Sequence, residues 1–158
     1  MEYSFETSKN LNLIAGTSKI DNILLWPHSD DDMVKVQGQL LKLFGEPIYI
    51  TPNLENAYIY VIVASDNTGK QFILSVYCGP SGPAIGGDKK IEGIQNVVER
   101  LKQYIQQAEP VDFEYVGYYL DTGSKITYEI KNGIISYSSV QIKGEELEKA
   151  HKLVYGHA

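Results

Sequence analysis

The chain has 158 residues, 43% hydrophobic and 22% charged, which are the proportions of an ordinary globular domain rather than of a disordered or fibrous chain. Its formal net charge is −6, and this argues against nucleic acid as a partner, because a phosphate backbone is bound by clustered Lys and Arg. The single cysteine, Cys78, excludes an intrachain disulfide and a cysteine zinc site. We expect one domain over residues 1–158.

The N-terminal segment carries no readable signal peptide. Residues 1–16 are polar and interleaved with charge, and no positive region followed by an apolar core is present. The longest apolar runs, such as residues 58–64, are far too short to cross a bilayer. We therefore expect no membrane partner, and the lone cysteine suits a location in the reducing cytoplasm.

The first part of the chain predicts one or two short strands and then a helix. Apolar residues in 3–26 fit no single period, and the strands are expected to end at Trp26-Pro27. Ser29 can cap the helix that follows, with Asp32 at the return position of a capping box, and Gly45 ends it. The apolar face of this helix is expected to consist of Met33, Val36, Leu40, Leu41 and Phe44.

Three strands and the longest helix are expected next. The strands are residues 48–51, 58–65 and 71–78, the second apolar on both faces and therefore central. A Gly/Pro loop from Gly79 to Asp88 then leads into a helix over residues 89–108, with Asp88 as its cap. The apolar stripe of the helix recurs at spacings of three and four and comprises Ile91, Ile94, Val98, Leu101, Ile105 and Ala108.

The last part of the chain predicts a second meander and a short helix. Strands are expected at residues 111–120, 125–131 and 134–142, and Asn132-Gly133 favours a type I′ turn between the last two. A helix over residues 144–155 is expected to turn inward Leu147, Ala150, His151 and Val154.

These elements predict an α+β fold. It consists of a single antiparallel or mixed sheet built from two three-stranded meanders, packed by two amphipathic helices and a short C-terminal helix.

The Gly/Pro loop is the first candidate site. Residues 82–89 approach the pattern of a phosphate-binding loop, but Asp88 stands where that pattern needs lysine. The loop is therefore interpreted as a stiff strand-to-helix turn, and if it binds anything, a protein surface or a neutral ligand is expected before a nucleotide. The candidate binding residues in it are Gly79, Pro80, Ser81, Gly82, Pro83, Gly86, Gly87 and Asp88.

A solvent-facing side of the second meander is the other candidate. Tyrosine is favoured at protein interfaces, because it brings contact area and a hydrogen bond at low entropic cost. Depending on register, one mildly acidic sheet face could gather Tyr118, Thr127, Glu129, Tyr137, Ser139 and Gln141. We take Tyr118, Glu129 and Tyr137 as its binding residues, with an ordinary exposed sheet face as the alternative.

Catalytic and metal sites are not indicated. Cys78 alternates with apolar residues and is interpreted as a small buried residue, not a nucleophile. The carboxylates at residues 30–32 splay outward from the first turn of a helix and are explained by its dipole. The histidines are scattered, so no catalytic residue, metal or cofactor is expected.

In size, acidity, α+β layout and lack of catalytic residues, the chain resembles the small bacterial immunity proteins that neutralise a cognate toxin. The resemblance implies a non-enzymatic protein-binding module whose negative surface covers a basic toxin, with electrostatics setting the association rate. Two alternatives stay open. One is a small-ligand domain that uses the loop from Gly79 to Asp88, and the other is an enzyme that uses Cys78. The sequence leaves the oligomeric state undetermined.

Overall fold

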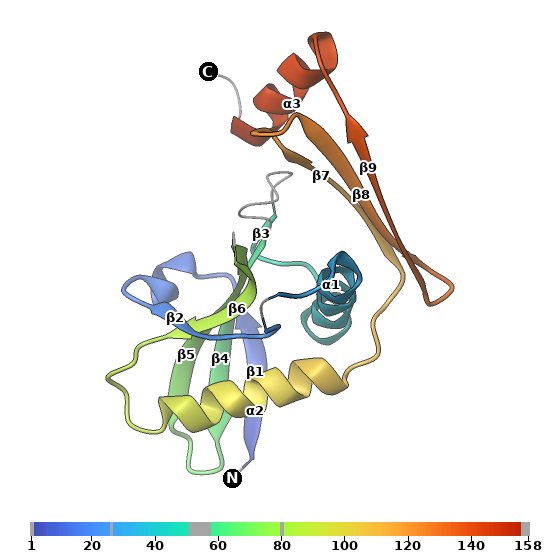
Figure 1. The fold of residues 1–158 in the computed structure, drawn as a ribbon. Helices are drawn as coiled ribbons and strands as arrows, with labels where there is room; N and C mark the ends of the chain where they lie inside the picture. Colours follow the sequence, from blue (N-terminus) through green and yellow to red (C-terminus); the bar gives the residue numbers. More distant parts are fainter. Residues whose placement is uncertain (1, 26, 51–57, 80, 156–158) are drawn as a thin grey trace.

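A computed structural model describes residues 2–25, 27–50, 58–79 and 81–155. The α+β class is confirmed, since the described residues form three α-helices and two antiparallel sheets (Figure 1). The elements in chain order are β1 (Tyr3–Ser8), the 3-10 helix η1 (Leu11–Ile14), β2 (Ser18–Asn22), α1 (Asp30–Phe44), β3 (Tyr49–Ile50), β4 (Tyr58–Asp66), β5 (Gln71–Gly79), β6 (Gly82–Gly87), α2 (Ile94–Gln107), β7 (Phe113–Tyr119), β8 (Ser124–Lys131), β9 (Ile134–Gln141) and α3 (Glu145–Tyr155).

The first sheet has the strand order β1-β4-β5-β6-β2, and β3 pairs with the same edge of β4 as β1 does. The hairpin between β4 and β5 is closed by Asp66, whose Oδ1 accepts hydrogen bonds from the Thr68 hydroxyl at 2.6 Å and from the amides of Thr68 and Lys70. The strands expected before the first helix are confirmed as β1 and β2, although β2 ends at Asn22. Trp26 lies outside the described residues.

The prediction of a Gly/Pro loop from Gly79 to Asp88 is wrong, because residues 82–87 form a strand. Buried along its whole length, β6 pairs with β5 on one side and β2 on the other. Glycine is needed here for close approach: a Cβ on Gly86 would lie 2.5 Å from Ser75 Oγ and 3.1 Å from the Ser18 carbonyl oxygen. The glycines that favoured a loop thus let three strands pack together.

Asp88 does not cap the long helix. Its carboxylate accepts a hydrogen bond from the Lys90 amide in a turn, and α2 begins only at Ile94, after Gly93 in a left-handed conformation at the N-cap. Four residues of the predicted apolar stripe are buried as expected, namely Ile94, Val98, Leu101 and Ile105, whereas Ile91 is 41% exposed. The buried positions of α2 are Ile94, Val97, Val98, Leu101 and Ile105.

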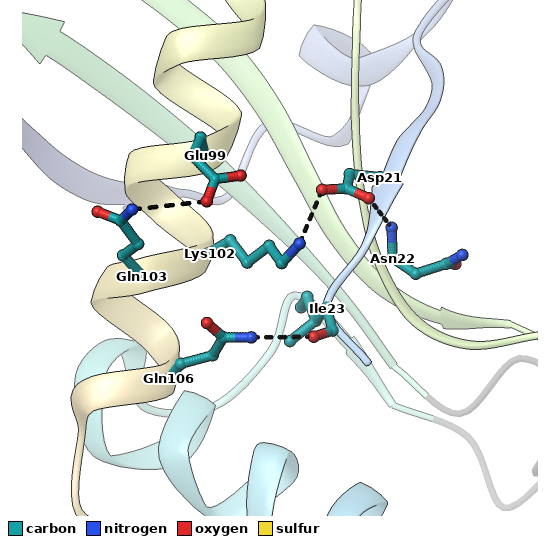
Figure 2. Close-up of polar contacts among 7 residues, drawn as sticks. All are labelled: Asp21, Asn22, Ile23, Glu99, Lys102, Gln103 and Gln106. Carbon is teal, nitrogen blue, oxygen red and sulfur yellow. Dashed lines mark hydrogen bonds and ion pairs between the residues drawn. The ribbon is translucent and has the colours of Figure 1, made fainter. Parts of the chain in front are cut away.

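Polar contacts join α2 to the end of β2 and to the residue that follows it (Figure 2). Lys102 Nζ lies 3.0 Å from Asp21 Oδ2, and the Gln106 side-chain amide donates a hydrogen bond to the Ile23 carbonyl at 3.2 Å. One helical turn separates the two donors, so both reach the same side of the helix. These contacts hold α2 in the position across the first sheet that Figure 1 shows.

Helix α1 lies between the two sheets, in contact with α2, β6, β8 and β9 (Figure 1). Its predicted ends are confirmed: the Ser29 hydroxyl accepts a hydrogen bond from the Asp32 amide, and Gly45 has φ 71°. Because α1 has neighbours on several sides, it is buried over an arc wider than the predicted stripe. The residues in that arc are Val34, Val36, Gln37, Gly38, Gln39 and Leu40.

The second sheet, β7-β8-β9, is separate from the first, so the expectation of one sheet for both groups of strands is wrong. The chain between the two sheets packs on Gly38 of α1. The Val111 amide donates a hydrogen bond to the Gly38 carbonyl, and a Cβ on Gly38 would lie 2.8 Å from Pro110 Cβ. The chain therefore passes directly over α1 before the second sheet begins. One hydrophobic cluster still includes residues of both sheets, while a single domain over residues 1–158 stays a prediction.

The turn and helix at the C-terminal end agree with most expectations. Asn132 and Gly133 have φ 54° and 77°, as a type I′ turn requires. In α3, Ala150 is buried, and Leu147 and Val154 are half-buried. His151 is exposed instead of turned inward.

Candidate functional site

The register of the second sheet divides the predicted solvent-facing cluster. Tyr118 lies opposite Lys125, and Glu129 lies between Glu114 and Ser136, all on the face turned away from α1. Tyr137 lies opposite Tyr128 and is therefore on the other face, together with Ser139 and Gln141. The predicted grouping is wrong for these three residues, because the two-residue turn fixes β9 so that its odd-numbered residues face inward.

A row of tyrosines crosses the inner face of the second sheet. Tyr115, Tyr128 and Tyr137 lie opposite one another on β7, β8 and β9, with ring centroids 6.1 and 5.5 Å apart. Tyr115 and Tyr128 are buried, whereas Tyr137 is 38% exposed. The row therefore leads from the core to the outer strand of the sheet.

A cavity of about 120 Å³ opens where the two sheets meet, next to Tyr115. Residues of α1, of the segment after it, of β4 and of β7 form its wall. They are Gln37, Leu41, Glu46, Pro47, Tyr58, Tyr60, Phe113, Glu114 and Tyr115. We call this space the tyrosine cavity.

The polar groups of the tyrosine cavity are deeply placed. Tyr58 is 3% exposed, and no hydrogen-bond partner for its hydroxyl lies among the described residues. Tyr60 differs, since its hydroxyl donates a hydrogen bond to the Gly45 carbonyl at 2.8 Å. Gln37 adds an amide side chain on a residue that is 7% exposed. The Tyr58 hydroxyl is thus a buried polar group without a hydrogen-bond partner among the described residues, on a residue that lines the cavity.

The cavity has a negative character. The charged residues of its wall, Glu46 and Glu114, are acidic, although the Glu114 side chain lies on the outer face of the second sheet and only its backbone faces Tyr115's side. Burial, and then the Glu46 carboxylate, raise the pKa of Tyr60 above its usual value. Burial is also the main cause that raises the pKa of Tyr58, with smaller contributions from Cys78 and neighbouring tyrosines. The phenols therefore stay neutral at physiological pH and can both donate and accept hydrogen bonds.

Cys78 does not add a nucleophile to this site. It lies opposite Tyr58 on β5 and is 4% exposed. Burial raises the pKa of its thiol to about 12. Because the reactive form of cysteine is the thiolate, its surroundings give no support to an enzyme built on Cys78.

The residues predicted in the Gly/Pro segment do not gather into a site. Gly82, Pro83, Gly86 and Gly87 are buried in β6, Gly79 ends β5, and Pro80 lies outside the described residues. Ser81 and Asp88 are exposed at opposite ends of the strand. None of the described residues among them lines the tyrosine cavity, and neither do Tyr118, Glu129 and Tyr137.

Asp88 lines a different groove, of about 330 Å³, beside η1 and the start of α2. Apolar side chains such as Leu13, Phe72 and Ile91 make up much of its wall. No buried side-chain polar atom without a partner is found along it in the described part of the chain. The groove therefore offers a ligand no buried polar atom that lacks a partner, unlike the tyrosine cavity.

Comparisons with protein-family models, curated proteins and solved structures found no significant match. In the described ranges, three or more His, Cys, Asp or Glu side chains do not gather in a metal-binding arrangement. None of the helices in those ranges is long and apolar enough to span a membrane. The assignment of function below therefore depends on the geometry of the tyrosine cavity.

Proposed function

We propose that the protein is a non-enzymatic binding protein whose tyrosine cavity receives the end of a cationic side chain, Arg or Lys, from a basic protein partner. The observation that carries the proposal is the Tyr58 hydroxyl, which is buried without a hydrogen-bond partner among the described residues, on a residue that lines a cavity with an acidic wall. An unpartnered buried hydroxyl destabilises a fold by about 1–3 kcal/mol. A ligand with N–H donors would remove that penalty.

The chemistry of the wall fits a cation. Tyr58, Tyr60, Phe113 and Tyr115 offer aromatic rings, and the face of such a ring attracts ammonium and guanidinium groups. Glu46 can supply the opposite charge, and the oxygens of Tyr58 and Gln37 can accept hydrogen bonds. An anion would meet repulsion from the Glu46 carboxylate.

The size of the cavity favours a side chain over a free ligand. Pockets for small molecules and cofactors typically occupy roughly 300–1,000 Å³, whereas the tyrosine cavity offers about 120 Å³. That space accommodates the tip of a side chain, and the rest of the partner would lie on the surface outside. The formal net charge of −6 would speed the approach of a basic protein.

Neutralisation of a basic toxin, which the resemblance to immunity proteins implies, is one specific form of this proposal. A cytoplasmic location also stays a prediction. The alternative of a small-ligand domain built on residues 79–88 is less supported, because Gly82–Gly87 is a buried strand, although Asp88 lines a groove.

The test is a titration followed by NMR, with N-acetyl-arginine methylamide as the probe. We expect saturable shifts at the residues of the cavity wall. Tyr58→Phe and Glu46→Gln should each weaken binding roughly 10- to 100-fold, because a hydrogen bond to a charged group contributes about 1.5–3 kcal/mol. The matched controls, Tyr118→Phe and Glu129→Gln on the outer sheet face, should bind like the wild type.

A second arm separates a protein partner from a small cation. The probe is the same arginine placed in the middle of a short glycine peptide. A protein partner predicts tighter binding of the peptide than of the free derivative, because residues outside the cavity add contacts. Equal affinity would favour a small cationic ligand. Unshifted wall residues with both probes, or no effect of Tyr58→Phe and Glu46→Gln, would overturn the proposal.

A further inference from the structure

The outer edge of β9 is open. One edge of this strand pairs with β8, and within the described ranges no strand lies along the other. The sequence of β9, IISYSSVQ, contains neither a charged residue nor proline, and its register with β8 runs without a bulge. Natural sheets usually protect an exposed edge with one of these three devices. This edge therefore has the properties of a pairing surface.

The hairpin determines which backbone groups face that edge. Asn132-Gly133 forms a two-residue turn, so Lys131 and Ile134 make the hydrogen-bonded pair that closes the hairpin. Backbone groups alternate in direction along a strand, so every second residue of β9 after Ile134 bonds to β8. The residues between them direct their N–H and C=O groups outward, and these are Ile135, Tyr137, Ser139 and Gln141.

We propose that β9 pairs antiparallel with β9 of a second copy of this chain, about a two-fold axis at Tyr137. In this register Ile134 lies opposite Val140 of the second copy, and Ser136 lies opposite Ser138. These two outer-face pairs combine side chains of similar size and polarity, whereas Ile135 lies opposite Ser139 on the inner face, and no like charges meet. An isologous contact of this kind closes after two chains and so gives a dimer.

The exposure of apolar side chains supports a second copy as the occupant. Ile134 is 71% exposed and Val140 57% exposed, and in the dimer each would cover the other across the two-fold axis. Tyr137 would face its own copy, next to the ring of Tyr128 5.5 Å away. The tyrosine rows of the two chains would then form one continuous row.

The test is the mass in solution by light scattering, with two double variants that place charges on exposed side chains of β9. The wild type should have twice the chain mass. Ser136→Lys/Ser138→Lys should be a monomer, because the proposed register opposes lysines at each pair. Ser136→Lys/Ser138→Glu should remain a dimer, because the same register opposes lysine and glutamate.

Circular dichroism and thermal unfolding would show that both variants keep the fold, since both side chains point to solvent on the outer face. Two results would overturn the proposal. The first is a wild type that stays monomeric at millimolar concentration, which would leave the edge to a strand of another protein. The second is a dimer that survives the lysine pair, which would place the contact elsewhere.

Discussion

The side chain of Gln39 in α1 donates a hydrogen bond to the backbone carbonyl of Ala108, 3.0 Å away, just beyond the C-terminal end of α2. The same amide donates to the carbonyl of Gln106 at 3.2 Å, and Gln39 is 3% exposed. The last carbonyls of a helix have no partner within it. A residue of one helix thus completes the end of another, at the point where the chain turns toward the second sheet.

Gln39→Met should therefore destabilise the protein by about 1–3 kcal/mol, because the change keeps much of the side-chain shape and leaves two carbonyls without their donor. Urea unfolding followed by circular dichroism measures the effect. Gln103→Met is the matched control, because Gln103 is exposed and bonds only weakly to Glu99, at 3.5 Å. Equal stability of the two variants would show that the Gln39 contact is unimportant.

Gly38→Ala should also destabilise the fold, although alanine favours helices over glycine by about 1 kcal/mol. Its Cβ would lie 2.8 Å from Pro110 Cβ and 2.9 Å from Ile130 Cδ1. Overpacking of this kind typically costs about 1–3 kcal/mol, so a net loss is expected. Lys35→Ala on the exposed side of α1 is the control. An increase in unfolding free energy for Gly38→Ala would contradict this packing.

Stability should fall as the pH rises above the ordinary tyrosine pKa of about 10. Burial raises the pKa of Tyr58, Tyr60, Tyr115 and Tyr128 in the folded chain. Below that pH both states keep these protons, so stability is unchanged on their account. Above it the unfolded chain loses protons that the folded chain retains, and unfolding becomes more favourable.

A spectrophotometric pH titration of the tyrosines, with circular dichroism recorded at each pH, measures whether tyrosine ionisation and unfolding occur together. Part of the tyrosinate absorbance should appear only together with loss of structure, and Tyr58→Phe should reduce that part. Full ionisation of all tyrosines while the circular dichroism spectrum remains folded would contradict the burial of these rings.

Lys102→Met should cost less than about 1 kcal/mol, despite the 3.0 Å contact with Asp21. The side chains of Lys102 and Asp21 are 19% and 37% exposed, and solvent screens such a pair. Added salt should reduce the difference between wild type and variant in urea unfolding. A loss of several kcal/mol that salt does not change would show that the pair contributes more than this account allows.

Local signals predicted several parts of this fold. Ser29 and Gly45 mark the two ends of α1, and Asn132-Gly133 forms the turn between β8 and β9. These features are predictable because helix caps and tight turns depend on residues that are neighbours in the sequence. The strand at Gly82–Gly87 was not predictable in this way. Its glycines indicate a loop when only sequence neighbours are considered, and their packing function appears only when residue 75 and residue 18 lie on either side.

The tyrosine cavity depends even more on distant segments. Gln37, Tyr58 and Tyr115 come from α1, β4 and β7, and nothing local connects them. The abundance of tyrosine, 12 of 158 residues, is the one sequence signal for this cavity. By itself it predicts an exposed, tyrosine-rich sheet face and not a cavity. The side on which a strand residue lies changes with a one-residue shift of register, and the pairing with Tyr128 places Tyr137 on the inner face.

The central claim is that the tyrosine cavity selects positive charge. The most direct measurement compares, by NMR titration of the wild type, N-acetyl-arginine methylamide with its citrulline counterpart, which has nearly the same shape but no charge. The account predicts saturable shifts at Gln37, Tyr58 and Glu46 with the arginine probe and far weaker binding of the neutral one. Equal binding of the two probes, or shifts confined to residues outside the cavity, would contradict it.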